Sequence, residues 1–354
     1  MGKRIAIVGT GALGGYVGGY LARAGLDVTF IDFWPENVEA MRSRGLELDG
    51  VTPDEQFTVR GLRALHVTDV QELTRGKPID IAFVAVKSYD TEWATTLIRP
   101  HLAPDGYVVS LQNCLNEERI AGVVGWGRTV GMVASLISVD MYEAARIRRT
   151  VAKGGDRHTV FRVGEVHGRI TRRVEELHEM VAAIDSAKTT TNLWGERWSK
   201  LCQNGMKNGV SAATGLTGTD CDRNDAIRRF SIKLGGEAVR VGQALGYQIE
   251  KIGKLDPERL ARAAEGDAAA LDEVEALLRP GSNTNPNPRA DIQRPSMAQD
   301  ILKGRRTEIE FMNGYIAERG AYIRVAAPTH TRLTEIVKKV ERGEVKPAPA
   351  LLGG

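Results

Sequence analysis

Three polar residues recur at a four-residue spacing in an otherwise apolar stretch, at Lys200, Asn204 and Asn208. In an α-helix this spacing places all three side chains on one face. The neighbours Leu201 and Met206 are apolar, and polar groups buried beside them cost free energy unless they meet a partner. This polar stripe of Lys200, Asn204 and Asn208 therefore predicts a helix face that binds a ligand. A structural polar network and a solvated face are the alternatives.

A second polar segment runs from Ser296 to Gly314. The pattern over residues 297–319 predicts helix, with Ser296 and Glu308 on one register. Glu308 follows Ser296 by 12 residues, a little over three helical turns, so the two side chains are expected to face the same cleft. The alternative for Glu308 is an ordinary surface glutamate paired with Arg305.

A glycine-rich turn near the amino terminus lies between an apolar run and an amphipathic segment. This order predicts a buried strand, a tight turn and a helix start. The first glycine permits the turn, the second lets the backbone approach a pyrophosphate, and the third lets the helix pack on the strand. An ordinary glycine-rich turn is the alternative. The residues predicted to bind a dinucleotide here are Gly9, Thr10, Gly11, Ala12, Leu13 and Gly14.

Three further polar residues stand where later strands of the same sheet are predicted to end, namely Asp32, Lys87 and Asn113. Ligands of open α/β sheets bind beyond the carboxyl ends of the strands, so all three are expected beside the cofactor. Asp32 follows Gly14 by 18 residues, close to the spacing of a ribose-binding carboxylate. The alternatives are a helix-capping aspartate, a solvated lysine and a turn asparagine.

The elements that must position these residues fall into two patterns. Strand and helix patterns alternate over the first ~140 residues, which predicts a doubly wound parallel sheet. Helical patterns follow, including long buried helices at 192–212 and 226–246. The predicted fold class is α/β, with an amino-terminal doubly wound Rossmann domain at 1–190 and a mainly α-helical carboxy-terminal domain at 191–345. Residues 346–354 are expected to form a loose tail.

The composition excludes several functional classes. The chain has 354 residues, with 48 basic against 45 acidic side chains interspersed, so neither a nucleic-acid nor a membrane surface is expected. Its three cysteines, Cys114, Cys202 and Cys221, lack metal-finger spacing, so no metal site is expected and a reducing compartment is favoured. With no signal-peptide region, we expect a cytoplasmic protein that acts on a small molecule. The composition leaves open whether the protein forms a homodimer.

Together these motifs resemble the ketopantoate reductase (2-dehydropantoate 2-reductase) family. That family has an amino-terminal G-x-G-x-x-G, a lysine after the fourth strand and an asparagine after the fifth. A W-x-K-L-x-x-N-x-x-x-N helix and an S-M-x-Q-D…R-x-T-E-I-[DE]-x-x-N-G segment follow. This chain has them in the same order as Gly9/Gly11/Gly14, Lys87, Asn113, Trp198–Asn208 and Ser296–Gly314.

The resemblance implies an NAD(P)-dependent oxidoreductase that transfers hydride between nicotinamide and a 2-oxo acid or a related carbonyl or hydroxy compound. Lys200 would be the general acid, with Glu308 fixing its geometry. The substrate would be held by Asn204, Asn208, Ser296 and Glu308. The alternatives are a secondary-alcohol dehydrogenase acting oxidatively on a larger substrate and a non-catalytic dinucleotide-sensing protein. A sensor has no need of a proton donor, so Lys200 favours the enzyme.

The chain departs from the family at several positions. Cys114 replaces a glycine, and Gly218 replaces a substrate-binding asparagine. The segment 251–294 is longer than the family's connection and is expected to line or cover the cleft, where Arg289 or Arg294 can reach a carboxylate.

The cofactor choice is expected to differ from that of the family. Ketopantoate reductases typically use NADPH and hold its 2′-phosphate with an arginine near the end of the second strand. This chain has Asp32 there, and no arginine follows until Arg42. A carboxylate accepts hydrogen bonds from the ribose of NAD and repels a phosphate, so NAD(H) is expected to be preferred over NADP(H).

Overall fold

The computed structural model describes residues 2–280 and 294–353, and the chain divides into two compact units, Met1–Leu193 and Trp194–Gly354. The boundary lies at the start of helix α6 (Leu193–Thr214), three residues beyond the position expected from the sequence pattern. Within the described ranges, none of the helices combines the length and the apolar character that crossing a membrane requires.

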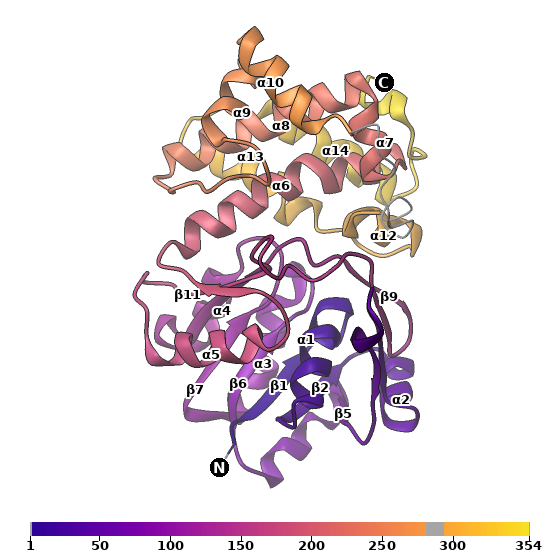
Figure 1. Cartoon of the computed structure of the whole chain (residues 1–354), viewed down its shortest axis with the longest axis vertical. Helices are drawn as coiled ribbons and strands as arrows, with labels where there is room; N and C mark the ends of the chain where they lie inside the picture. Colours follow the sequence, from indigo (N-terminus) through magenta and orange to yellow (C-terminus); the bar gives the residue numbers. More distant parts are fainter. Residues whose placement is uncertain (1, 281–293, 354) are drawn as a thin grey trace. The chain divides into compact units, whose positions relative to one another are not determined.

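The amino-terminal unit is built on an eight-stranded sheet in the order β12-β11-β8-β7-β6-β1-β2-β5 (Figure 1). The strands from β8 to β5 pair in parallel, and β11 runs antiparallel to β8. These six parallel strands have the order of a classic dinucleotide-binding sheet, which confirms the predicted Rossmann domain. The bounds are β1 Arg4–Val8, β2 Asp27–Asp32, β5 Arg63–His66, β6 Ile79–Val84, β7 Leu102–Ser110, β8 Thr129–Ala134, β11 Phe161–Glu165 and β12 Ala187–Thr189.

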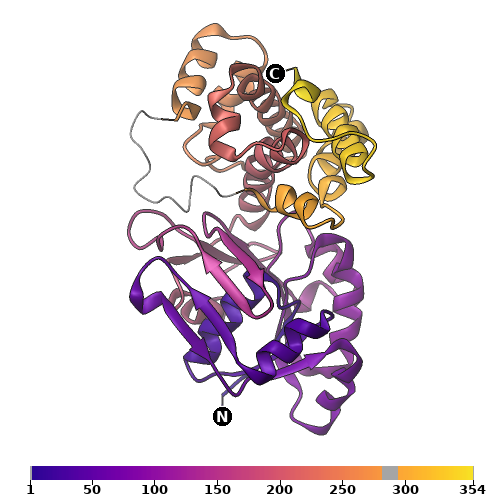
Figure 2. The ribbon, with the colours of Figure 1, turned by 90° about the vertical axis from the view of Figure 1, so that its right-hand side faces the viewer.

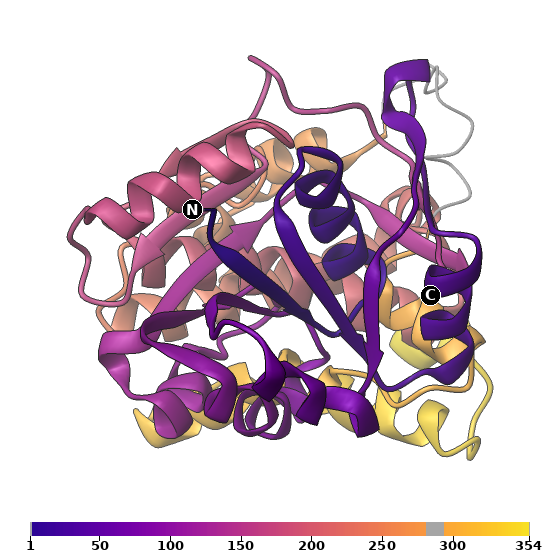
Figure 3. The same ribbon diagram turned by 90° about the horizontal axis from the view of Figure 1, so that it is seen from below.

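Both faces of this sheet are covered, because successive side chains of each strand point to opposite sides. Ile5 and Ile7 face a core that includes residues of α1 and α5, whereas Ala6 and Val8 face a core that includes residues of α3 and α4. Figure 3 shows helices on either side of the strands. The helices are α1 Ala12–Arg23, α2 Pro35–Ser43, α3 Thr91–Ile98, α4 Glu117–Val124 and α5 Arg172–Ala182. Short 3₁₀ turns occupy Pro53–Glu55, Val67–Arg75, Ser88–Asp90, Arg99–His101 and Trp126–Arg128.

A second, four-stranded sheet packs against α1 in the order β4-β3-β10-β9 (Figure 2). Its strands are β3 Leu46–Asp49, β4 Gln56–Val59, β9 Val139–Glu143 and β10 Arg146–Arg149. Strand β10 pairs in parallel with β3, which lies about a hundred residues earlier in the chain. Helix α1, which follows the glycine-rich turn, is therefore held between two sheets.

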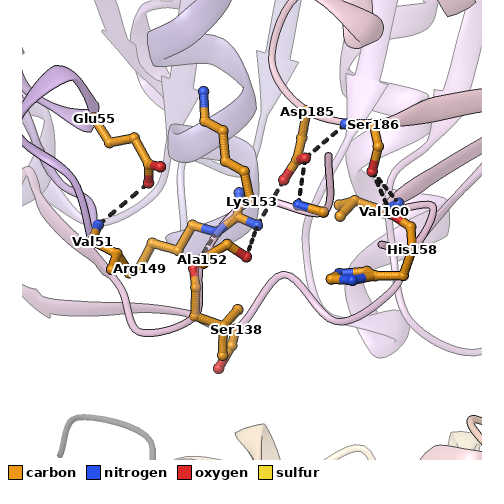
Figure 4. Close-up of polar contacts among 12 residues, drawn as sticks. Val51, Glu55, Ser138, Arg149, Ala152, Lys153, His158, Val160, Asp185 and Ser186 are labelled. Atoms are coloured by element: carbon orange, nitrogen blue, oxygen red, sulfur yellow. Dashed lines mark hydrogen bonds and ion pairs between the residues drawn. The ribbon is translucent and has the colours of Figure 1, made fainter. Parts of the chain in front are cut away.

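A buried ion pair holds the segment after β10 (Figure 4). The Arg149 guanidinium lies 2.6 Å from the Asp185 carboxylate, and both side chains are almost completely buried. Arg149 also donates to the Tyr16 hydroxyl at 2.8 Å, and Asp185 accepts from the backbone N–H groups of Gly154 and Ser186. These bonds tie α1 to the segment after β10 and to the turn before β12.

The carboxy-terminal unit is helical in its described part, as the sequence predicts. The long helices α6 and α8 (Asp225–Ala244) are both present, and α8 packs against α9, α13 and α14. Asp256 and Asp267 cap the helices after them, each accepting a backbone N–H at 3.0 Å. The remaining bounds are α7 Gly218–Arg223, α9 Pro257–Ala264, α10 Ala268–Leu278, α12 Ser296–Leu302, α13 Asn313–Tyr322 and α14 Pro328–Glu341.

Two expectations for this unit are wrong. The helix expected over 297–319 is broken, because α12 ends at Leu302 and Gly304 adopts a φ of 60°. A 3₁₀ turn at Ile309–Phe311 then precedes α13. The tail from 346 is not loose in its described part. Residues Pro349–Leu352 form a 3₁₀ turn, Leu352 is buried, and the Ala348 N–H donates to Ala213 O at 3.0 Å.

Candidate functional site

The glycine-rich turn after β1 favours glycine at two positions, one for its backbone conformation and one for lack of space. Gly9 has a φ of 93°, and a Cβ at Gly14 would lie 2.2 Å from the Gly9 carbonyl oxygen. At Gly11, in contrast, a Cβ would meet no atom within 4 Å, and this residue is exposed at the start of α1. The first N–H groups of a helix have no partner within the helix and attract anions. The turn therefore fits a dinucleotide pyrophosphate.

Asp32 ends β2 beside this turn and is buried. Its Oδ1 accepts the Trp34 N–H at 3.0 Å, and its Oδ2 accepts the Asn37 side-chain amide at 2.9 Å. Burial raises the pKa of Asp32, and these hydrogen bonds act in the opposite direction. Asp32 does not cap α2, whose N-cap is Trp34, but its two hydrogen bonds hold the segment that leads into this helix, at the edge of the sheet expected to bind the ribose. The sequence interpretation missed Asn37, whose signal is an amide in the first turn of the helix after Asp32.

Lys87 and Asn113 follow β6 and β7, at the same edge of the sheet as Gly9 and Asp32. Both are half-buried, so Lys87 is not a fully solvated loop lysine. The amide of Asn116 joins the two loops, donating to Ser88 Oγ at 3.1 Å and to the Asn113 carbonyl at 2.9 Å. The loops after β6 and β7, which carry two of the residues predicted to lie beside the cofactor, are thus joined by one buried amide.

Cys114, the departure from glycine after Asn113, has a φ of 65° and is buried. This left-handed conformation favours glycine, because a Cβ clashes with the following carbonyl. The glycine that the resemblance implies at this position would fit the backbone of the loop without this clash.

In the carboxy-terminal unit, Lys200, Asn204 and Asn208 lie on α6 as predicted. Lys200 and Asn204 are half-buried and Asn208 is buried, so the alternative of a solvated face is wrong. Trp198 fixes this helix to α8, because its ring is fully buried and its Nε1–H donates to Ala238 O at 2.9 Å. The polar stripe thus sits on a helix whose position is set by the core.

Ser296 and Glu308 approach α6 by a different route from the one predicted. Ser296 begins α12, and Asn208 Nδ2 lies 3.5 Å from its Oγ, although 88 residues separate the two. Glu308 is buried and is not a surface glutamate. Its neighbour Ile309 packs at Gly209, where a Cβ would lie 3.1 Å from Ile309 Cδ1. Chain crossing, rather than helical periodicity, brings these two segments to α6.

The other departures contribute little visible chemistry. Gly218 starts α7 with open space around its Cα, and the Arg294 guanidinium donates to the Gly215 carbonyl. Arg289 and the rest of 281–293 lie outside the described residues. Across 2–280 and 294–353, no group of three His, Cys, Asp or Glu side chains is arranged to hold a metal ion.

These two sets of residues can perform complementary chemistry. The edge with Gly11 and Asp32 presents helix N–H groups and a carboxylate, which suit a pyrophosphate and a ribose. The α6 stripe offers an ammonium and two amides, joined by the hydroxyl of Ser296. Such donors suit a carboxylate and a carbonyl oxygen, and a lysine in such a stripe can also supply a proton.

Comparison with known proteins identifies the family. The family model described as ketopantoate reductase PanE/ApbA matches residues 5–156, and the model of its C-terminal domain matches residues 192–341. The chain is 26% identical to the 2-dehydropantoate 2-reductase of Archaeoglobus fulgidus over 342 residues, covering 96% of this chain and 99% of that protein.

Solved structures agree over the same length. A PanE/ApbA family ketopantoate reductase from Ralstonia eutropha JMP134 has a TM-score of 0.75 at 26% identity, covering 96% of this chain and 99% of that one. D-mandelate dehydrogenase, solved with NADH and anilino(oxo)acetate, shares the fold with a TM-score of 0.77, 20% identity and the same coverage. The chain is therefore an NAD(P)-dependent oxidoreductase acting on CH–OH and C=O groups, and it belongs to the ketopantoate reductase PanE/ApbA family.

Proposed function

We propose that this protein reduces the keto group of a 2-oxo acid with NADH, and that Lys200 donates the proton. The observation that carries the proposal is the polar stripe of α6, where Asn208 also meets Ser296 Oγ at 3.5 Å. It places an ammonium, two amides and a hydroxyl on and beside one partly buried helix face. A 2-oxo acid offers two kinds of acceptor, a carboxylate and a keto oxygen, that such donors bind.

Each residue has a separate role in this proposal. Gly11 and the start of α1 would hold the pyrophosphate, and Asp32 would face the adenosine ribose. The nicotinamide, when bound, supplies the hydride. Lys200 Nζ then gives its proton to the alkoxide that develops on the keto oxygen. Asn204, Asn208 and Ser296 would hold the substrate, and the buried Glu308 would orient the lysine.

The preference for NAD over NADP follows from charge at the end of β2. A 2′-phosphate about 4 Å from an ionised Asp32 would be repelled by about 4 kcal/mol at an effective dielectric of about 20. Screening and side-chain movement reduce this, leaving a preference on the order of 10–10³-fold. Arg42 offers no compensation, because its guanidinium is bound by Glu39, Asp69 and the Ala64 carbonyl.

A screen of 2-oxo acids and 2-hydroxy acids with both cofactors tests this proposal, with the absorbance of the reduced nicotinamide as the readout. We expect turnover of a 2-oxo acid with a higher kcat/KM for NADH than for NADPH. Equal values, or a preference for NADPH, would overturn the role of Asp32. Turnover of secondary alcohols alone would favour the oxidative alternative, and cofactor binding without any turnover would favour a sensor.

A homodimer and a cytoplasmic location remain part of the proposal. Cys114, Cys202 and Cys221 are free, which is the usual state of cysteines in a reducing compartment. Light scattering should give about twice the chain mass of 38.6 kDa for a homodimer. A molar mass equal to that of one chain would exclude it under the same conditions.

A further inference from the structure

Asn37 makes more contacts to the cofactor edge than its place on α2 requires. It is completely buried, and its Nδ2 donates to the Thr10 carbonyl at 3.0 Å and to Asp32 Oδ2 at 2.9 Å. Its Oδ1 accepts the Ala145 N–H at 2.8 Å. An amide side chain has two N–H donors and one carbonyl oxygen, so both ends of this group are engaged.

These contacts join three segments that the chain brings together from different elements. Thr10 belongs to the glycine-rich turn after β1, Asp32 ends β2, and Ala145 lies in the turn between β9 and β10. Backbone bonds support the same arrangement, because the Gly9 N–H donates to Ile31 O at 2.9 Å. The Asn37 amide therefore fixes the distance between the turn expected at the pyrophosphate and the carboxylate expected at the ribose.

The direction of the Asp32 carboxylate depends on this amide. The Trp34 N–H holds Oδ1, the backbone N–H groups of Phe33 and Thr10 also act on the carboxylate, and Asn37 holds Oδ2 from a side chain. Without Asn37, Oδ2 loses its side-chain donor, and the position of the Asp32 charge is fixed from the backbone alone. Hydrogen bonds to a carboxylate also favour its ionised form, which is the form that repels a phosphate.

We propose that Asn37 is a positioning residue that sets the preference for NAD over NADP by holding Asp32 against the glycine-rich turn. The inference rests on the proposed function, in which Asp32 discriminates between the cofactors. Asn37 contacts neither cofactor nor substrate in this account, and it acts through Asp32 and Thr10. A purely structural amide would contribute to folding and leave the cofactor ratio unchanged.

Three variants test the proposal with NADH and NADPH as the two probes. In Asn37→Ala, the NADH KM should rise about tenfold and the ratio of kcat/KM for NADH over NADPH should fall about tenfold, as expected for one lost bond to a charged group. The kcat at saturating NADH should stay within about twofold, since the hydride-transfer groups are untouched. Val38→Ala removes buried apolar atoms from the same helix and should lower the melting temperature without changing the ratio.

Asn37→Leu serves if the alanine variant does not fold. It has a similar volume and adds no charge, but it cannot donate to Asp32 or Thr10. Its cofactor ratio should fall at least as far as that of Asn37→Ala. An unchanged ratio in a folded Asn37 variant would overturn the proposal.

Asp32→Asn, measured in parallel, distinguishes a failure of the positioning role of Asn37 from a failure of the proposed role of Asp32 in cofactor choice. If Asp32→Asn leaves the cofactor ratio unchanged, the role of Asp32 fails and the role of Asn37 fails with it. If Asp32→Asn lowers the ratio and neither Asn37 variant does, only the positioning role fails. In the double variant Asp32→Asn/Asn37→Ala, the ratio should fall no further than in Asp32→Asn alone, because Asn37 acts through Asp32.

Discussion

The two units position their polar side chains in different ways. At the edge of the sheet proposed to bind the cofactor, loops after neighbouring strands are held together by backbone geometry and buried amides such as Asn37 and Asn116. In the carboxy-terminal unit, the side chains proposed to act on the substrate stand on one long helix, and a crossing segment brings Ser296 to Asn208. The positions of the strand-end motifs can be read from local sequence, whereas the amides that join these loops, like the contact of Ser296 with Asn208, depend on packing between distant parts of the chain.

The largest expected effect is a loss of kcat on changing a residue of α6 in the carboxy-terminal unit. Lys200→Ala should reduce kcat by about 10²–10⁴-fold, the range of a positioned general acid. Lys207→Ala is the matched control, because Lys207 lies on the same helix and its ammonium pairs with Asp222. Steady-state kinetics of both variants decide the matter. Similar small losses in the two would reduce Lys200 to a structural lysine.

The next effect concerns the stability of the sheet unit. Replacing Arg149 with Met leaves the buried Asp185 carboxylate without its cation, which should cost about 3–5 kcal/mol in the free energy of unfolding. Arg149→Met/Asp185→Leu should recover much of this loss, because no buried charge remains. Denaturant unfolding of both variants measures the effect. A loss below about 1 kcal/mol for Arg149→Met would mean that water reaches the carboxylate in the native state.

In the helical unit, a decrease of similar size in the free energy of unfolding is expected at acidic pH. His330 is fully buried, between the Leu234 carbonyl at Nε2 and the Asn313 amide at Nδ1, and burial lowers its pKa from 6.5 to about 4. Between these values the unfolded chain binds a proton that the native state does not. Stability should therefore fall as the pH decreases through this window, by up to roughly 3 kcal/mol.

His330→Gln tests this origin of the pH dependence. The variant should be less stable at neutral pH, since it loses the fitted ring, but its stability should fall less steeply between about pH 6.5 and pH 4. Urea unfolding at several pH values gives both slopes. Equal slopes for the two proteins would assign the acid sensitivity to other groups.

The smallest effect concerns the loop after β7. Because Cys114 has a φ of 65°, Cys114→Gly should be more stable than Cys114→Ala by up to about 1 kcal/mol. At a position with an ordinary helical or extended backbone, the alanine variant would be the more stable of the two. Thermal unfolding of Cys114→Gly and Cys114→Ala therefore tests the backbone conformation directly. A more stable alanine variant would contradict the left-handed geometry.

The same contrast explains what could be predicted from the sequence. The glycine spacing, Asp32 and the stripe of α6 were predictable, because local periodicity and turn chemistry determine them. Glu308 was placed on one helix with Ser296, and Gly304 breaks that helix in a way that periodicity cannot reveal. Asn37 was missed because its three partners lie on separate elements, and only tertiary structure brings them together.

The central claim is that the amino-terminal unit selects the cofactor and the carboxy-terminal unit supplies the proton. Equilibrium titration of Lys200→Ala and Asp32→Asn with NADH and with NADPH, monitored by nicotinamide fluorescence, tests it most directly. Lys200→Ala should bind NADH within about twofold of the unmodified chain, whereas Asp32→Asn should shift the ratio of NADH to NADPH affinity by about tenfold or more. Loss of NADH binding in Lys200→Ala, with an unchanged affinity ratio in Asp32→Asn, would contradict this division of roles.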